Sequence, residues 1–85
     1  MIEVSIVEDD NEIRESLAIL INGTAEFTCI NTYCDCETAI PGILNDPPHV
    51  VLIDIGLPGM SGIEGIRKIK ENLTNVGFNR IMINR

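Results

Sequence analysis

The sequence predicts an α/β domain in which helices cover a doubly wound parallel sheet. Short apolar runs typical of strands alternate with helical patterns along the chain, in the order β-α-β-α-β-α-β. Such alternation implies right-handed crossover connections and parallel strands. The run at residues 49–53 is apolar on both faces, as expected for a strand covered on both sides.

The N-terminal part contains the first two strands and the first helix. Residues 2–7 form a strand with apolar side chains at Ile2, Val4, Ile6 and Val7. The helix that follows has an inward face at the i, i+4, i+7, i+8 spacing, made of Ile13, Leu17, Leu20 and Ile21. Asp9 or Asp10 should cap this helix, and Asn22-Gly23 should end it. Residues 27–33 read as the second strand.

The second helix carries an unfavourable residue in its interior. Asp35 should cap it, and its inward face consists of Ala39, Ile40, Ile43 and Leu44. Pro41-Gly42 falls where the interior should be, and proline there costs about 3 kcal/mol. We therefore expect a short or kinked helix that stops at Asp46-Pro47-Pro48.

The third helix begins with a capping box, in which Ser61 bonds forward and Glu64 bonds back. Its inward face is predicted to consist of Ile63, Ile66, Ile69 and Leu73. Residues 75–79 read as a turn, and residues 80–83 as a fourth short strand.

Composition excludes several classes of protein. Thirteen acidic residues against six basic ones give a net charge of −7, which argues against binding nucleic acid. No apolar stretch approaches the roughly 18–20 residues of a membrane span, and the N-terminus does not resemble a signal peptide. We therefore expect a cytoplasmic protein without membrane contact.

The three cysteines and the histidine are expected to have structural rather than functional roles. Cys29 falls in a strand and reads as a small core residue, and Cys34 and Cys36 lack the second CxxC or histidine pair that would complete a zinc site. His49, before the third strand, reads as a turn residue.

Two acidic groups stand where predicted strands end. Glu8-Asp9-Asp10 follows the first strand, and Asp54 follows the third, just before a loop rich in proline and glycine. Either group alone could be ordinary, since acids favour helix N-termini and aspartate favours turns. Ligands of open α/β sheets bind beyond the carboxyl ends of strands, so the joint occurrence favours one site.

Chemistry then suggests a magnesium site around a reactive aspartate. If Glu8, Asp9 and Asp54 lie about 5 Å apart, each pair repels by roughly 3 kcal/mol at an effective dielectric constant near 20. A cation would offset this repulsion, and oxygen ligands with room for water suit Mg²⁺. A carboxylate beside Mg²⁺ can also accept a phosphoryl group.

These motifs resemble the receiver domains of two-component response regulators. The resemblance rests on Val7-Glu8-Asp9-Asp10 and on the stretch from Val51 to Gly62, with its Asp-x-x-x-Pro-x-x-x-Gly loop, and covers residues 2 to about 73. It implies the flavodoxin-like, CheY-like fold. It further implies these roles: Asp54 as phosphoacceptor; Glu8, Asp9, Asp54 and the Gly56 carbonyl as the Mg²⁺ site; Pro58 and Gly62 as residues that shape the loop.

The sequence also departs from the family pattern. Asn84 takes the place of the family's Thr or Ser after the fourth strand, and the position of the family's Lys would follow Arg85. We therefore expect residues 1–85 to be one receiver-like domain without its C-terminal third and without an output domain. Phosphorylation should then be inefficient.

The resemblance implies a signalling domain that takes a phosphoryl group from a sensor histidine kinase, with self-catalysed phosphotransfer at most. The alternative is a degenerate, non-phosphorylated module for protein interaction. A haloacid-dehalogenase-type phosphatase is disfavoured because its Asp-x-Asp core needs an acid where Gly56 stands. Self-association through the fourth strand and an exposed apolar face is also expected, because an unprotected strand edge can pair with another chain.

Overall fold

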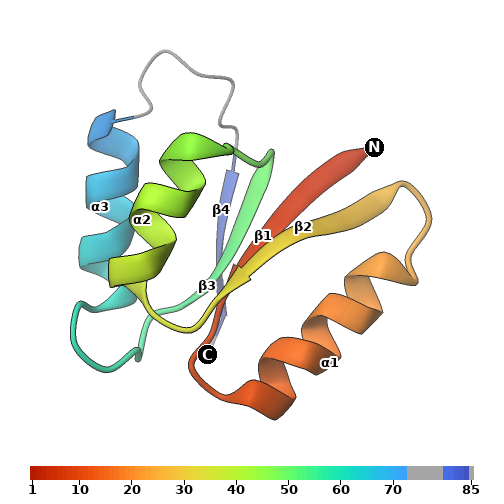
Figure 1. Ribbon diagram of the computed structural model, residues 1–85, viewed down its shortest axis with the longest axis horizontal. Coiled ribbons are helices and arrows are strands. Elements are labelled where there is room, and N and C mark those ends of the chain that lie inside the picture. The colour runs from red at the N-terminus through yellow and green to blue at the C-terminus, as the bar shows by residue number, and fades with distance from the viewer. Residues whose placement is uncertain (73–79, 85) are drawn as a thin grey trace.

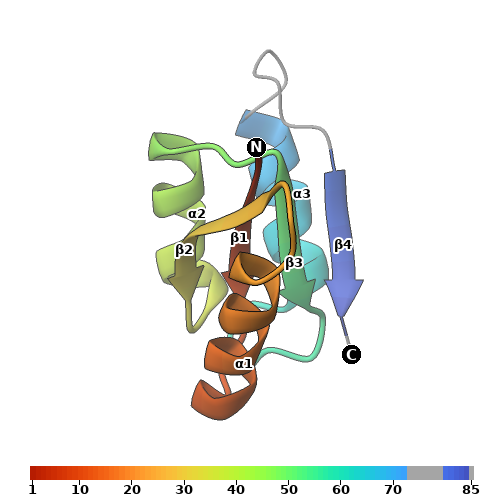
Figure 2. The same cartoon turned by 90° about the vertical axis from the view of Figure 1, so that its right-hand side faces the viewer.

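A computed structural model describes residues 1–72 and 80–84 of the chain. It shows one parallel sheet of four strands in the order β2-β1-β3-β4, with α1 on one face and α2 and α3 on the other (Figures 1 and 2). In chain order the elements are β1 (Ile2–Val7), α1 (Asn11–Asn22), β2 (Phe27–Tyr33), α2 (Cys36–Asn45), β3 (Val50–Asp54), α3 (Gly62–Asn72) and β4 (Arg80–Asn84). The predicted fold class and element order are confirmed.

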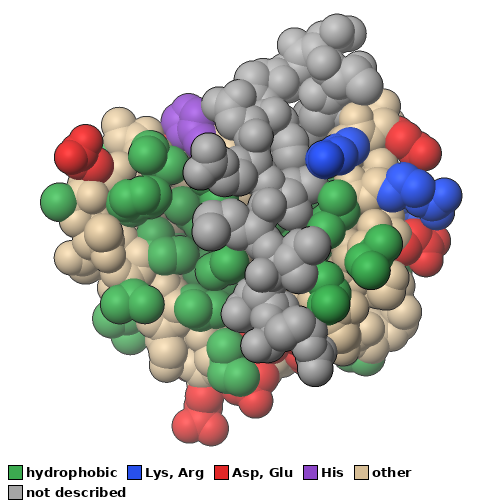
Figure 3. Space-filling model, turned by 180° about the vertical axis from the view of Figure 1, so that it is seen from behind, with side chains coloured by type: hydrophobic (Ala, Val, Ile, Leu, Met, Phe, Trp, Pro, Cys, Tyr) green, Lys and Arg blue, Asp and Glu red, His purple; other side chains and the backbone are tan. Residues whose placement is uncertain are grey.

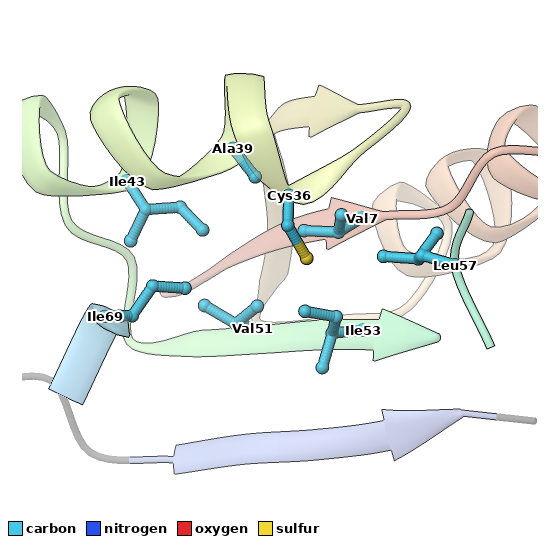
Figure 4. Close-up of a cluster of buried hydrophobic side chains, with 8 residues drawn as sticks. All are labelled: Val7, Cys36, Ala39, Ile43, Val51, Ile53, Leu57 and Ile69. Carbon is cyan, nitrogen blue, oxygen red and sulfur yellow. The ribbon is translucent and has the colours of Figure 1, made fainter. Parts of the chain in front are cut away.

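The core lies between the sheet and the pair α2 and α3. Figure 4 shows the cluster of buried side chains that fills this layer: Val7, Cys36, Ala39, Ile43, Val51, Ile53, Leu57 and Ile69. Its members come from β1, β3, both helices and the loop after β3. The core therefore fixes the carboxyl ends of β1 and β3 relative to each other.

The third strand begins one residue later than predicted and includes Asp54. His49 lies outside it but is already tied to β1: its backbone N–H donates to the Glu3 carbonyl at 2.9 Å, and its Nδ1 accepts from the Glu3 N–H at 2.9 Å. The imidazole therefore takes the place of a strand carbonyl and aligns the start of β3.

The predicted inward face of α1 is only partly correct. Asp10 is the N-cap, and Leu17 and Ile21 are half-buried, but Ile13 and Leu20 are 47% and 66% exposed. In the described part of the chain α1 has no neighbouring helix on its face of the sheet (Figure 2). The flanks of its apolar stripe therefore remain in contact with solvent.

The second helix runs without a break past Pro41, over ten residues, and Ala39 and Ile43 are buried as predicted. The third helix differs from expectation, because Ile63 is 65% exposed. The buried stripe of α3 is instead Gly62, Gly65 and Ile69. Leu73 and the predicted turn at residues 75–79 lie outside the described residues.

Gly65 explains why the third helix turns this stripe inward. A Cβ at this position would lie 2.6 Å from the Cys36 Sγ. The absence of a side chain lets α3 pack directly against the first turn of α2. Glycine in the helix has therefore replaced the isoleucine contact that periodicity predicted.

The second strand contains a β-bulge that changes which side chains face each helix layer. Val4 pairs with Cys29 but Ser5 pairs with Asn31, so Ile30 is an extra residue. Beyond the bulge Val7 pairs with Tyr33, and both pack in the layer of α2 and α3. Cys29 is consequently half-buried on the other face rather than a core residue.

Candidate functional site

The acidic residues converge at one edge of the sheet. β1 and β3 are adjacent and parallel, with Val7 paired to Ile53, so the residues that follow each strand emerge together. One carboxylate oxygen from each of Glu8, Asp9 and Asp54 lies within 4.8 Å of the other two. The structure therefore brings these three predicted residues together, from segments more than forty positions apart in the sequence.

Glu8 is the most constrained of the three residues. Its side chain is buried, with 4% exposed. Its backbone N–H donates to the Tyr33 carbonyl at 2.9 Å, and its carbonyl accepts from Arg14 Nη1 at 2.8 Å. Its Oε2 accepts the Asp10 backbone N–H at 3.1 Å. Contacts from β2 and α1 thus fix the backbone of Glu8, and the N-cap residue Asp10 bonds its carboxylate.

The pKa of the Glu8 carboxyl is raised above its usual value. Burial is the largest cause, and the neighbouring Asp9 and Asp54 carboxylates raise this pKa further, against the lowering effect of the Asp10 N–H. The site therefore favours an added positive charge, either a proton or a cation. An all-oxygen cluster with two partly solvated members suits Mg²⁺, which keeps several waters.

Asp54 is the last residue of β3, and two contacts hold the loop that follows against the end of this strand. Asp54 Oδ1 accepts the Gly56 N–H at 2.9 Å, and the Gly62 N–H donates to the Ile55 carbonyl at 3.3 Å. A Cβ on Gly62 would lie 2.5 Å from the Asp54 carbonyl oxygen and 2.7 Å from the Ile55 Cα. Glycine is therefore required here by the backbone itself. Pro58 lies exposed in the same loop.

The fourth strand ends at the same edge of the sheet. In the β3–β4 register Asn84 is the partner of Asp54. The backbone position predicted for the family's Thr or Ser therefore lies beside the candidate phosphoacceptor.

Sequence reasoning missed three residues near this edge. Arg14 reaches back from α1 to the Glu8 carbonyl, Cys36 Sγ lies 3.6 Å from the Ser61 carbonyl, and Glu37 Oε2 accepts the Met60 N–H at 3.2 Å. No periodic pattern or motif distinguishes these positions, because each contact joins two different elements. Only the tertiary arrangement reveals them.

Comparison with known proteins agrees with this geometry. Residues 4–83 match the response regulator receiver domain, which is nearly the whole chain. The chain belongs to the response regulator receiver family. Receiver domains are signalling domains that histidine kinases phosphorylate, and they generally bind Mg²⁺ at an acidic pocket.

Similar proteins include enzymes and transcriptional regulators. The chain is 38% identical over 71 residues to a protein-glutamate methylesterase/protein-glutamine glutaminase of Nitrosospira multiformis, covering 84% of this chain and 20% of that protein. It is 35% identical over 71 residues to the transcriptional regulatory protein YdfI of Bacillus subtilis, covering 84% of this chain and 33% of that protein. The chain thus spans a minor part of each relative.

Solved structures show the same fold. The response regulator domain of Thermotoga maritima CheB aligns with a TM-score of 0.87 at 23% identity, over 98% of this chain and 59% of that one. A LuxR-family two-component response regulator from Aurantimonas aligns with a TM-score of 0.86 at 28% identity, over 98% of this chain and 57% of that one.

Among the described helices, none has the length and the apolar character that crossing a bilayer requires.

Proposed function

We propose that Asp54 is the phosphoacceptor of one receiver unit over residues 1–85, and that it takes its phosphoryl group from the phosphohistidine of a sensor kinase. The observation that carries the proposal is the convergence of three carboxylates within 4.8 Å at the ends of β1 and β3. A carboxylate at a strand end, held by neighbours and supplied with a cation, is a suitable nucleophile toward phosphorus.

Each residue has a separate role in this proposal. An Asp54 oxygen forms the new bond to phosphorus while the bond from phosphorus to the donor's histidine nitrogen breaks. The acidic pair Glu8 and Asp9, Asp54 itself and the Gly56 carbonyl would hold Mg²⁺, which when bound neutralises charge on the transferring phosphoryl oxygens. The Gly56 N–H bond to Asp54 Oδ1 orients the carboxylate. Pro58 and Gly62 set the path of the loop, and Asn84 stands where the family has Thr or Ser.

Phosphorylation with a small donor tests this proposal. The chain is incubated with acetyl phosphate with and without Mg²⁺, and intact mass is measured. We expect a Mg²⁺-dependent gain of one phosphoryl group, lost in Asp54→Asn and retained in Asp46→Asn, a control at an exposed aspartate. A gain that survives in Asp54→Asn would place the acceptor elsewhere. No gain in any variant would favour the alternative, an interaction module without phosphorylation.

We also propose that two copies of the chain associate through β4, the outermost strand of the described sheet. Among the described residues β4 is paired only with β3, so its other side offers backbone groups to a second strand. Hydrophobic side chains of the described residues gather on the face of the molecule that Figure 3 shows. Ile13 and Leu20 of α1 and Ile63 of α3 are 47%, 66% and 65% exposed.

Light scattering across a concentration series tests this association. We expect the average mass to rise toward that of a dimer, and Leu20→Ser to shift the rise to higher concentration if α1 contributes. A monomer at every concentration, with an ordered fourth strand, would refute the proposal.

A further inference from the structure

The loop that joins β3 to α3 is held by a carboxylate from a different element. Glu37 lies in the first turn of α2, and its Oε2 accepts the Met60 backbone N–H at 3.2 Å. The bond spans 23 positions in the sequence and is made by an ionisable acceptor to a neutral donor. Hydrogen bonds to charged groups are stronger than neutral ones.

The backbone of the loop is shaped to receive this carboxylate. Gly59 has φ +73°, in the left-handed region that favours glycine. A Cβ on Gly59 would lie 2.8 Å from Glu37 Oε2. Glycine at this position therefore both adopts the turn and leaves room for the Glu37 carboxylate to reach the next N–H.

The same turn of α2 makes a second contact with the loop. The Cys36 thiol lies 3.6 Å from the Ser61 carbonyl as a weak donor, and Leu57 is buried in the core below. At its base the loop is held by the bond from the Gly56 N–H to Asp54 Oδ1 and by the bond from the Gly62 N–H to the Ile55 carbonyl, both between residues close in the sequence. The first turn of α2 therefore holds the distal half of the loop through residues that are distant from the loop in the sequence.

We infer that Glu37 is a positioning residue that holds the loop after Asp54 in the conformation in which Asp54 and Gly56 face the acidic pocket. The inference rests on the proposed function, because it concerns the same site. In the described part of the chain the Glu37 carboxylate is bonded to the Met60 N–H and not to Glu8, Asp9 or Asp54. It acts through the Met60 N–H, by restricting the loop whose other end carries Gly56.

Three variants separate the hydrogen bond from the charge. Glu37→Ala removes both, and Glu37→Gln keeps an acceptor oxygen without the charge. Glu12→Ala is the matched control, because Glu12 has the same position after its aspartate cap in α1, and the described residues give its carboxylate no hydrogen bond. NMR then measures hydrogen exchange of the Met60 amide and the Mg²⁺ titration of the amides at residues 8–10 and 54–57.

In Glu37→Ala we expect Met60 exchange at least about tenfold faster, and a Mg²⁺ dissociation constant roughly two- to tenfold higher, as for loss of one hydrogen bond to a charged group. Glu37→Gln should recover most of both effects, and Glu12→Ala should leave Met60 exchange unchanged. Gly59→Ala should reproduce the Glu37→Ala result, because its methyl group displaces the carboxylate. Unchanged exchange of the β1 and β3 amides verifies that each variant is folded.

Two results would overturn the inference: Met60 exchange equal in Glu37→Ala and Glu12→Ala, or a Mg²⁺ affinity as weak in Glu37→Gln as in Glu37→Ala. Neither depends on phosphorylation. If the unsubstituted chain binds Mg²⁺ but acquires no phosphoryl group, the proposed function fails while the role of Glu37 in the loop can still be measured.

Discussion

Replacing Glu8 by glutamine should make the metal-free protein more stable at neutral pH. The side chain keeps its shape and can still accept the Asp10 N–H that Glu8 Oε2 accepts at 3.1 Å. What is lost is one of three negative charges with oxygens within 4.8 Å of each other. The substitution therefore tests whether the cluster is destabilised by its own charge.

The magnitude follows from the geometry. At 4.8 Å and an effective dielectric constant of about 20, each pair of charges repels by about 3.5 kcal/mol. Asp9 is exposed and Asp54 is half-buried, so solvent screens much of this repulsion. We expect about 1–3 kcal/mol of the repulsion from the two partners to remain. Glu8→Gln should raise the free energy of unfolding by that amount.

The pH dependence has a definite sign. Because the folded-state pKa of Glu8 lies above the ordinary value of 4.5, the folded state binds this proton more tightly than the unfolded state. The stability that Glu8 contributes is fully present below pH 4.5 and is lost as the pH rises through its folded pKa. The two proteins should therefore be equally stable in acid, and the variant should gain its advantage as the pH rises.

Urea unfolding in EDTA and in Mg²⁺, at several pH values, measures these effects. At a Mg²⁺ concentration about 100 times its dissociation constant, binding adds about 2.7 kcal/mol to the unsubstituted protein. The variant should gain less, so its advantage should shrink or reverse. Glu15→Gln, at an exposed acid on α1, is the control and should change little. A Glu8→Gln protein that is less stable in EDTA at neutral pH would refute the reasoning.

Three further substitutions test the packing around the site, each by urea unfolding. Gly62→Ala should cost about 2–3 kcal/mol, although alanine is normally the better helix former, and a gain in stability would contradict the contact with the Asp54 backbone. Gly65→Ala should cost about 1–3 kcal/mol, and less in a Cys36→Ala background; a double-mutant cycle without coupling would show that the two do not meet. Ser5→Ala should be neutral or stabilising by up to about 1 kcal/mol, because the described residues offer its buried hydroxyl no partner. A clear loss would show that the hydroxyl is bonded.

The element order and the converging acids could be predicted because both follow from local signals. Apolar runs that end in carboxylates determine where strands stop, and parallel topology then places Glu8, Asp9 and Asp54 at one edge. The helix caps were equally local: Asp35 accepts the Thr38 N–H at 2.8 Å, and Ser61 Oγ accepts the Glu64 N–H at 3.2 Å, as the forward half of the capping box.

The errors arose where packing decides the outcome. Helical periodicity assigned Ile63 to the core because it treats glycine as neutral, whereas Gly62 and Gly65 lie so close to their neighbours that a Cβ would clash. Periodicity likewise could not show that the flanks of the α1 stripe, at Ile13 and Leu20, have no cover in the described chain. Whether a glycine allows close packing, and whether a helix face is covered, depends on residues from other elements. The sequence of the helix alone does not contain this information.

The burial of Cys36 under α3 makes its chemical reactivity a report on motion between the two helices. Its side chain is fully buried, and burial is the main cause that raises the pKa of this thiol to about 11. A thiol reagent needs both access and the thiolate, so it can modify Cys36 only after α2 and α3 have separated. Cys34, two residues earlier, is exposed and reacts without any such opening. The labelling rate of Cys36 relative to that of Cys34 therefore measures how often the two helices part, and it needs no introduced cysteine.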